Sequence, residues 1–591
     1  NHWKSLGNLG ILAEQSNRYD KAKIFLQEAL QIEPNNEKLH YNLGIVFEEL
    51  VDIKQALNCY KKAWQINNDY ENAIKKISFL LGGYKLDINL IQEKQIEELF
   101  LTLFKRNDIN HNHIINNAIK IFYSDHVLKS IINDKAPILK NFNIQKLLRK
   151  ELFILIMQKS IIANKIYEQI LTRIRKEILF AINDINFNKL NKNFDFIISL
   201  AEQCFLNEYI FNQSEKETNE ILLLKNSILK KNEINELKVA IFSCYIPLYN
   251  NKIIANKLLK YQSSNKLFND LISLQVRNLL KEKELTYCIN SFGKITDVIS
   301  QKVKKQYESY PYPRWRYTYK NSPVNFLSIL NNKIKMDQIK NNNKFYNPNV
   351  LVAGCGTGQH VLDVCNYQNA KILAVDLSLT SLSYAKRKTD ELEIKNVEYL
   401  HADILQLKKL KRKFDVIEAA GVLHHMKDPL KGLRIIVDLL EPHGFLKLGL
   451  YSKIARKHII EAKNFVKKNQ FKNTREEIRR FRNEIFNLTE NTSLKEVTKL
   501  HDFYSMSNVK DLIFHVKEHL FTLPQISKIL YDFKLIFLCF NDIKNLVKSK
   551  FSTDFPDDNN FTSLKNWDQF ETNNPNTFTG MYNFWVKKMN D

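Results

Sequence analysis

A chain of 591 residues is too long for a single hydrophobic core, so its length predicts three or more domains. Hydrophobic residues make up 44% and charged residues 26%, proportions that exclude wholesale disorder and are ordinary for a globular protein. The net charge of +24 is compatible with binding to nucleic acid. However, the basic residues are scattered and the abundance of Lys, Asn and Ile is typical of AT-rich codons, so nucleic acid is not the favoured partner.

The seven cysteines argue against a disulfide framework or a zinc knuckle, because they lie far apart and none belongs to a Cys-x-x-Cys pair. A reducing, cytoplasmic location fits this pattern. No apolar run approaches the ~20 residues that a membrane-spanning helix needs, and no signal peptide is recognisable. The chain begins at Asn1 and not at Met, so the presence of a targeting segment upstream stays open.

Residues 1–83 contain an internal repeat with a period of 34 residues. The recurring residues are Leu9-Gly10 and Leu43-Gly44, Ala22 and Ala56, Leu26 and Tyr60, and Ala29 and Ala63. This pattern resembles tetratricopeptide repeats, in which Gly and Ala let the two helices of a unit approach closely. We expect Leu26 and Tyr60 to fill the space between units. Two repeats are fewer than a free-standing solenoid usually needs, so we expect further repeats upstream or a cap formed by the next helical region.

Residues 84–300 are predicted to form an all-helical domain, because apolar residues recur at helical spacing and glycine is absent between Gly83 and Gly293. No chemical motif occurs there. Residues 301–345 form a connecting segment whose stretch from Gln306 to Tyr317 is dense in aromatic residues and Pro, so we expect that stretch to be extended and rigid. A Lys/Asn-rich helix or linker follows from Asn331 to Asn343.

Residues 346–591 alternate short apolar strands with helices, which predicts a parallel, doubly wound sheet. The first five strands are expected at Val350–Ala353, Lys371–Asp376, Val397–Asp403, Phe414–Ala420 and, after the turn Pro442–Gly444, Phe445–Leu450. Ligands of such sheets bind at the carboxyl ends of the strands. Here those ends carry the loop Gly354-Cys355-Gly356-Thr357-Gly358, two carboxylates and two histidines.

This constellation resembles the class I S-adenosylmethionine-dependent methyltransferases of the type 11/12 group. The resemblance rests on Val350–Gly358, Asp376, Ala402-Asp403-Ile404 and Phe414 through Met426. It implies S-adenosylmethionine as cofactor and a seven-stranded sheet with an antiparallel last strand, for which Leu535–Phe540 and Tyr582–Val586 supply the sixth and seventh strands. A nicotinamide or flavin enzyme is disfavoured, because the dinucleotide fingerprint needs a different glycine spacing.

The resemblance assigns cofactor binding to the strand ends. Asp376 is expected to accept hydrogen bonds from both ribose hydroxyls, and Asp403 to meet the adenine amino group with Ile404 against the ring. The glycine loop offers bare backbone to the cofactor. The complete set of expected cofactor-binding residues is Gly354, Cys355, Gly356, Thr357, Gly358, Asp376, Leu377, Asp403, Ile404 and Gly421.

His424 and His425 follow the fourth strand and are the candidate catalytic residues, because imidazole has a pKa suited to removing a proton from an acceptor. A packing role for the pair is the alternative. Tyr307, Tyr312 or Trp315 would cover the sulfonium with an aromatic face, or belong to a rigid linker.

An insertion at residues 451–525 is expected to supply an acceptor pocket from Tyr451, Asp511, His515 and Glu518, the alternative being a solvated helix face. His515-x-x-Glu518-His519 also matches the spacing of a zinc peptidase family when placed on a helix. A metallopeptidase would need a fold of its own, whereas these residues already belong to the expected methyltransferase domain, so we expect no metal ion.

The sequence therefore predicts a cytoplasmic S-adenosylmethionine-dependent methyltransferase with an unidentified acceptor, for which a protein recruited by the repeats is the favoured source. One alternative is a scaffold whose methyltransferase fold binds cofactor but no longer transfers methyl. Another alternative is an RNA methyltransferase. The sequence argues against it, because Ala419-Ala420-Gly421-Val422 occupies the place of the Asn-Pro-Pro-Tyr-type motif that base N-methylation would require.

Overall fold

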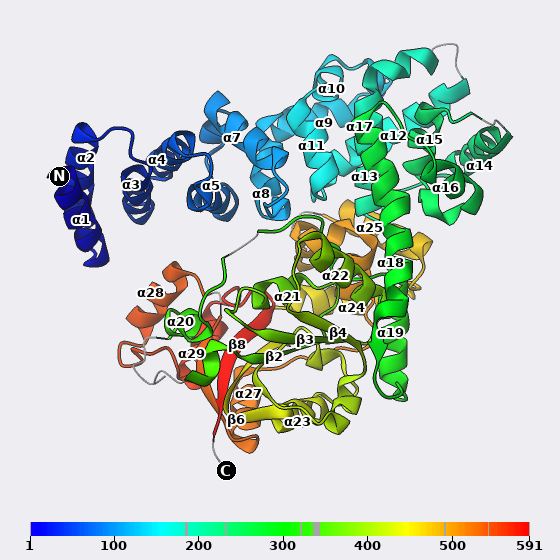
Figure 1. Cartoon of the computed structure of the whole chain (residues 1–591). Helices are drawn as coiled ribbons and strands as arrows, with labels where there is room; N and C mark the ends of the chain where they lie inside the picture. The colour runs from blue at the N-terminus through cyan, green and yellow to red at the C-terminus, as the bar shows by residue number, and fades with distance from the viewer. Residues whose placement is uncertain are drawn as a thin grey trace. The chain divides into compact units, whose positions relative to one another are not determined.

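The computed structural model describes residues 2–84, 86–183, 187–230, 233–319, 322–334, 343–489, 492–541 and 543–589. The chain forms two compact units (Figure 1). The helical unit comprises Asn1–Pro247, Ser263–Leu271 and Arg316–Lys320, and the sheet unit comprises Leu248–Gln262, Ile272–Trp315 and Asn321–Asp591. No helix of the described residues is both long enough and apolar enough to cross a membrane.

The N-terminal repeat folds as consecutive helix pairs. The helices are α1 (His2–Gln15), α2 (Tyr19–Ile32), α3 (Glu37–Glu49), α4 (Ile53–Ile66) and α5 (Glu71–Gly83). Polar side chains begin two of them: Asn36 accepts hydrogen bonds from the N–H groups of Lys38 and Leu39, and Asp52 accepts one from Gln55. The helical hairpins predicted from the 34-residue period are thus present.

Glycine allows the helices within each pair to meet. A Cβ atom on Gly10 would lie 2.6 Å from Cγ of Leu26, and one on Gly44 would lie 2.6 Å from Cε1 of Tyr60. Leu26 and Tyr60 each pack on the glycine of their own unit, and their expected role between units stays a prediction. The side chain occupies the space that a small residue leaves on the partner helix.

We expect Gly44→Ala to destabilise the second helix pair by about 1–3 kcal/mol, because the added methyl group overpacks the contact with Tyr60. This sign is the reverse of the ordinary effect of Gly→Ala in a helix, which stabilises. Gly83→Ala is the matched control, since a Cβ there meets no atom closer than 3.9 Å. Hydrogen exchange of α3 and α4 in the two full-length variants measures the difference; equal protection would contradict the close packing.

The rest of the helical unit contains no strand among its described residues. Its helices are α6 (Ile88–Ile91), α7 (Lys94–Lys105), α8 (His111–Ala118), α9 (Asp125–Asn133), α10 (Phe142–Leu147), α11 (Glu151–Lys159), α12 (Lys165–Phe180), α13 (Phe194–Leu206), α14 (Glu215–Lys230), α15 (Glu236–Ser243) and α17 (Lys266–Ile272). The segment Arg316–Lys320 also belongs to this unit: Arg316 forms a 2.8 Å ion pair with the fully buried Glu202, and the hydroxyls of Tyr319 and Ser78 lie 2.7 Å apart.

Three parts of the sequence prediction need correction. Residues 84–300 are not all helical, because Asn290–Ser291 forms strand β1 of the sheet unit, after helices α16 (Lys252–Leu259) and α18 (Asn278–Leu285). The stretch Gln306–Tyr317 is not extended throughout, because α19 (Val298–Ser309) continues to Ser309. The predicted Lys/Asn-rich helix or linker from Asn331 to Asn343 lies largely outside the described residues.

The sheet unit is built on one eight-stranded sheet in the order β1-β4-β3-β2-β5-β6-β8-β7. The strands after β1 are β2 (Asn349–Ala353), β3 (Lys371–Asp376), β4 (Val397–His401), β5 (Phe414–Ala420), β6 (Leu440–Tyr451), β7 (Leu535–Phe540) and β8 (Met581–Lys588). Pairing is parallel from β1 to β6, and β8 runs antiparallel to both β6 and β7. The predicted seven strands and the antiparallel last strand are confirmed, and β1 adds an eighth.

The turn predicted at Pro442–Gly444 lies inside a strand. β6 begins at Leu440, which pairs with Phe414, and the next pair is Phe445 with Val416, so several residues of β6 bulge out of the ladder. His443 takes up the bend with a φ of 61°. Pro and Gly here mark an irregularity within a strand instead of its start.

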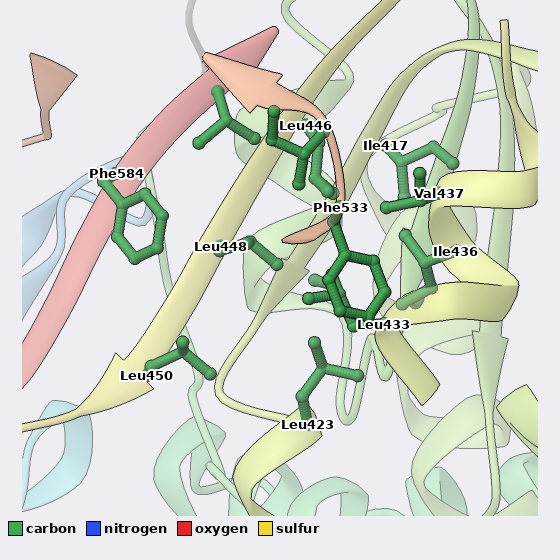
Figure 2. Close-up of a cluster of buried hydrophobic side chains, with 14 of the residues drawn as sticks. Ile417, Leu423, Leu433, Ile436, Val437, Leu446, Leu448, Leu450, Phe533 and Phe584 are labelled. Carbon is green, nitrogen blue, oxygen red and sulfur yellow. The ribbon is translucent and has the colours of Figure 1, made fainter. Parts of the chain in front are cut away.

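Helices cover both faces of the sheet. One face carries α23 (Pro429–Leu439), α27 (Leu523–Asp532), α28 (Asn545–Asp554) and α29 (Leu564–Asn573), and the other carries α20 (Phe326–Asn331), α21 (Gln359–Val364) and α22 (Leu379–Glu391). Figure 2 shows side chains of α23, β5 and β6 gathered around Phe533 on the first face. Burial on both faces explains why the central strands are continuous apolar runs.

The insertion after β6 is helical as predicted, with α24 (Lys457–Lys468), α25 (Arg475–Asn487), the short 3₁₀ turns η11 (Ser493–Lys499) and η12 (His501–Tyr504), and α26 (Met506–Leu512). α26 ends at Leu512, so His515, Glu518 and His519 are not on a helix. The helical placement expected for the His515-x-x-Glu518-His519 pattern is therefore wrong.

Candidate functional site

A cavity of about 540 Å³ opens at the carboxyl ends of β2, β3, β4 and β5, entirely within the sheet unit. Its size is in the range of small-molecule sites. The strand ends contribute Gly354, Cys355, Gly356, Asp376, Leu377, Ala402, Asp403, Ile404, Gly421 and Val422. Eight of the ten expected cofactor-binding residues thus line one cavity, because parallel strands present their carboxyl ends at the same edge.

The glycine loop between β2 and α21 needs glycine on two grounds. Gly354, Gly356 and Gly358 have φ values of +73°, +53° and +84°, in the left-handed region that side chains disfavour. A Cβ on Gly354 would also lie 2.5 Å from Cγ2 of Val422, and one on Gly358 would lie 2.7 Å from Cβ of Ala385. Gly358 and the buried Thr357 do not line the cavity, so they shape the loop from behind.

Asp376 ends β3 and is held by the backbone. Its Oδ2 accepts a hydrogen bond from the N–H of Gly356 at 2.8 Å, and its Oδ1 accepts one from Ser378 at 2.8 Å. Burial raises the pKa of Asp376, and these N–H donors oppose that rise. The loop and the carboxylate therefore form one preorganised rim of the cavity.

Asp403 follows β4 and has an unused acceptor. Its Oδ1 accepts a hydrogen bond from the N–H of Leu405 at 2.9 Å, whereas Oδ2 is buried and accepts none within the described part of the chain. Burial raises the pKa of Asp403, and that N–H group partly offsets the rise. Since buried carboxylate oxygens are rarely left unpaired, this atom indicates a ligand with a hydrogen-bond donor.

The aromatic segment between Tyr307 and Trp315 lines the cavity and holds the glycine loop by hydrogen bonds. Tyr307 and Tyr312 line it, but Trp315 does not. The indole N–H of Trp315 donates to the carbonyl of Thr357 at 3.1 Å, and the hydroxyl of Thr357 donates to the carbonyl of Pro313. Trp315 thus fixes the glycine loop, whereas the two tyrosines face the ligand space.

The two candidate catalytic histidines occupy different environments. His424 is fully buried, stacks on Tyr451 with ring centroids 3.7 Å apart, and does not line the cavity. His425 lines the cavity, and its Nδ1–H donates to the carbonyl of Lys517 at 3.0 Å. Burial holds the pKa of both histidines well below the ordinary value, so both are neutral at pH 7.

The insertion brings Asp511 and His515 beside Tyr307. The hydroxyl of Tyr307 donates to Oδ1 of Asp511 at 2.6 Å and lies 3.2 Å from Nε2 of His515. Asp511 and Tyr451 line the cavity, whereas His515 and Glu518 do not. Glu518 instead pairs with Arg456 at 3.4 Å and with Lys463, so its expected place in the pocket is wrong.

Charge in the cavity is the opposite of the charge of the chain. Although the protein carries a net +24, the ionisable lining groups include five aspartates and one arginine: Asp363, Asp376, Asp403, Asp502, Asp511 and Arg456. Burial and the neighbouring Asp511 raise the pKa of Asp502 to about 6. No sequence motif pointed to Asp363, Asp502 or Arg456, because only the fold brings them to the cavity.

One group of potential metal ligands occurs among the described residues. A ligand atom from each of His425, Asp511 and His515 lies within 4.8 Å of the others. The rings of His425 and His515 stack with centroids 3.8 Å apart, both place Nδ1 against the carbonyl of Lys517, and Nε2 of His515 lies 3.2 Å from the hydroxyl of Tyr307. His519 is turned to the carbonyl of Met426 at 3.1 Å, so the zinc peptidase pattern is not assembled.

A buried charge cluster beneath the cavity also escaped the sequence analysis. Glu418 of β5 is fully buried, pairs with Lys447 of β6 at 3.0 Å, and accepts hydrogen bonds from His360 and Tyr367. These partners hold the pKa of Glu418 below its ordinary value despite burial. His360 lines the cavity, so the cluster positions part of its wall.

Comparison with known proteins identifies two parts of the chain. Residues 345–502 match the model of a methyltransferase domain, and residues 3–36 match that of a tetratricopeptide repeat. The chain is 27% identical over 183 residues to the uncharacterized protein syc1184_c of Synechococcus sp., covering 28% of this chain and 41% of that protein. It is 26% identical over 132 residues to the ubiquinone biosynthesis O-methyltransferase of Coxiella burnetii, covering 22% of this chain and 54% of that enzyme.

Among solved structures, PKMT2 from Rickettsia typhi shares 18% sequence identity with a TM-score of 0.35, covering 45% of this chain and 54% of that chain. The chain thus spans about half, or less, of the length of these relatives. Residues 345–502 belong to the methyltransferase domain family, and residues 3–36 form a tetratricopeptide repeat.

Proposed function

We propose that the sheet unit binds S-adenosylmethionine and transfers its methyl group to an acceptor delivered by a protein bound to the N-terminal repeats. The observation that carries the cofactor proposal is a pair of carboxylates, Asp376 and Asp403, at the ends of neighbouring strands in the cavity wall. Asp376 lies against the N–H of Gly356, and the buried Oδ2 of Asp403 has no hydrogen bond from the described residues. Asp376 suits ribose hydroxyls, and Asp403 suits an adenine amino group.

The charge of the cavity supports this cofactor over a dinucleotide. Five aspartates against one arginine would repel a pyrophosphate but favour a sulfonium and an ammonium group. Tyr307 and Tyr312 add aromatic faces, which attract cations. The methyltransferase model over residues 345–502 supports the same reading.

S-adenosylmethionine supplies an electrophilic methyl group on a sulfonium. The chain contributes alignment: the glycine loop, Asp376, Tyr307, Tyr451 and Asp511 line the same cavity. Of the histidine pair, only His425 lies where it can touch an acceptor. We therefore assign His424 a packing role under Tyr451 and keep His425 as a pocket residue.

The repeats support a protein partner. Residues 3–36 match a tetratricopeptide repeat, and α3 and α4 form a second helix pair. Modules of this kind present surfaces to peptides and proteins. A nucleic-acid acceptor is disfavoured by the acidic cavity.

Two measurements on the full chain test the proposal. Calorimetric titration should give saturable binding of S-adenosylmethionine and S-adenosylhomocysteine. Incubation of the full chain with cell extract and methyl-labelled cofactor should then place the label in the protein fraction. Label confined to RNA or to small molecules would remove the protein acceptor, and tight cofactor binding with no label in any fraction would favour the scaffold.

A further inference from the structure

We propose that the acceptor atom is the nitrogen of a primary amine, which enters the cavity as an ammonium group and is received by Asp511 and Asp502. This inference rests on the proposed function and names its substrate class. Three features carry it: the hydrogen-bonded pair of Tyr307 and Asp511, the excess of aspartates in the cavity, and the pairing of the cavity's arginine with Glu518.

Tyr307 orients Asp511. The hydroxyl of Tyr307 donates to Oδ1 of Asp511 at 2.6 Å and lies 3.2 Å from Nε2 of His515. Burial and the neighbouring carboxylate keep the pKa of Tyr307 well above its ordinary value, so this hydroxyl stays protonated and remains a donor. Because Asp511 lines the cavity, its carboxylate presents a fixed acceptor to whatever enters beside it.

The arginine in the wall does not cancel this negative charge. Arg456 lies over the ring of Tyr451 at 3.6 Å and pairs with Glu518, which also binds Lys463. Its charge is thus shared with a carboxylate outside the cavity. The five lining aspartates therefore outnumber the one lining arginine, and the cavity is acidic in a protein whose overall charge is +24.

Other acceptor classes fit this wall less well. A carboxylate acceptor or a phosphate-bearing one would be placed against two carboxylates. A phenolate or enolate oxygen would need a positive group to stabilise it, and Arg456 is paired with Glu518. An ammonium group, in contrast, gains both the carboxylates and the rings of Tyr307 and Tyr312.

The reaction balances with these groups. The ammonium donates hydrogen bonds to Asp511 and Asp502, and one proton passes to the carboxylate of Asp511 and then to solvent. The freed nitrogen lone pair forms the N–C bond as the C–S bond breaks, and sulfur keeps the bonding electron pair. Positive charge moves from sulfur to nitrogen, where the two aspartates stabilise it.

The chemistry of the transferred label tests the acceptor class directly. The full chain is incubated with methyl-labelled cofactor and a protein extract, in one sample native and in a matched sample with its amines acetylated beforehand by acetic anhydride. We expect the label to survive acid hydrolysis as N-methylated amino acid and to be lost in the acetylated sample. Base-labile ester label, or label that persists after acetylation, would overturn the amine.

Variants test the two named residues. We expect Asp511→Asn to lower kcat/KM for the native extract by about 100-fold, in the range of a lost general base, with the Kd of the cofactor unchanged. Tyr307→Phe, which removes a positioning hydroxyl, should lower kcat more than it raises KM. Asp557→Asn, at an exposed position outside the cavity, is the matched control.

The results separate the two levels of the proposal. Unaltered transfer by folded Asp511→Asn, checked by its thermal unfolding, would overturn the role of Asp511. Absence of any label despite cofactor binding would contradict the proposed transferase function itself, whereas label on oxygen would contradict only the amine.

Discussion

Replacing Asp376 by alanine is expected to weaken the binding of S-adenosylmethionine by about 100-fold or more. Hydrogen bonds to a charged group contribute about 1.5–3 kcal/mol each, and in the proposed cofactor site Asp376 accepts two from ribose hydroxyls. A loss of about 3 kcal/mol corresponds to slightly more than 100-fold in Kd. Calorimetric titration of the full chain measures the change.

Asp376→Asn separates charge from shape. The amide keeps one acceptor oxygen, so we expect a smaller loss of about tenfold, close to the value of one neutral hydrogen bond. Asp557→Ala is the control for removing an exposed aspartate. Because Asp376 also accepts hydrogen bonds from Gly356 and Ser378, thermal unfolding must show that the loop is retained. A Kd for Asp376→Ala within twofold of the wild type would refute the assigned cofactor site.

Replacing Glu418 by alanine is expected to destabilise the central sheet by about 3–5 kcal/mol, because removal of one partner from a buried ion pair leaves the other charge without compensation. Lys447, directly opposite on β6, would lose its carboxylate, and the hydrogen bonds from His360 and Tyr367 would be broken. Hydrogen exchange of β5 and β6 in the full chain measures the local loss.

Glu398→Ala is the matched control on the same sheet. Glu398 pairs with Arg412 at 3.0 Å, but their side chains are 55% and 42% exposed, so the loss should stay below about 1 kcal/mol. Equal protection of β5 in the two variants would contradict the structural role of Glu418.

The same cluster predicts the direction of acid sensitivity. Because the folded-state pKa of Glu418 lies below its unfolded value, its ionised form contributes stability above the unfolded pKa of about 4.3. That contribution is lost progressively as the pH falls below that value. We expect the stability of β5 to fall between about pH 4.3 and pH 3 in the wild type, and to fall less in Glu418→Gln. Equal acid dependence of the two proteins would show that Glu418 is not the titrating group.

Local pattern was sufficient for much of the sheet and the cofactor end of the cavity. β3, β5 and β7 lie at the predicted residues, because a strand buried on both faces requires a continuous apolar run. Gly354, Gly356 and Asp376 were recognisable because each belongs to a short local pattern. The tight turn requires glycine, and the carboxylate directly ends the next strand. The short strand β1 was not recognisable, because two residues carry no periodicity and only pairing with β4 defines them.

By itself, then, the sequence determined the positions of seven strands along the chain, the glycine loop and the 34-residue repeat, all of which arise from neighbours in the chain. Only the tertiary structure decided that Tyr307 meets Asp511, that Glu518 turns away to Arg456, and that His424 lies under Tyr451. These contacts join an aromatic segment, a strand end and an insertion that are far apart in the chain. Their distances depend on the packing of the whole sheet unit, which no local spacing encodes.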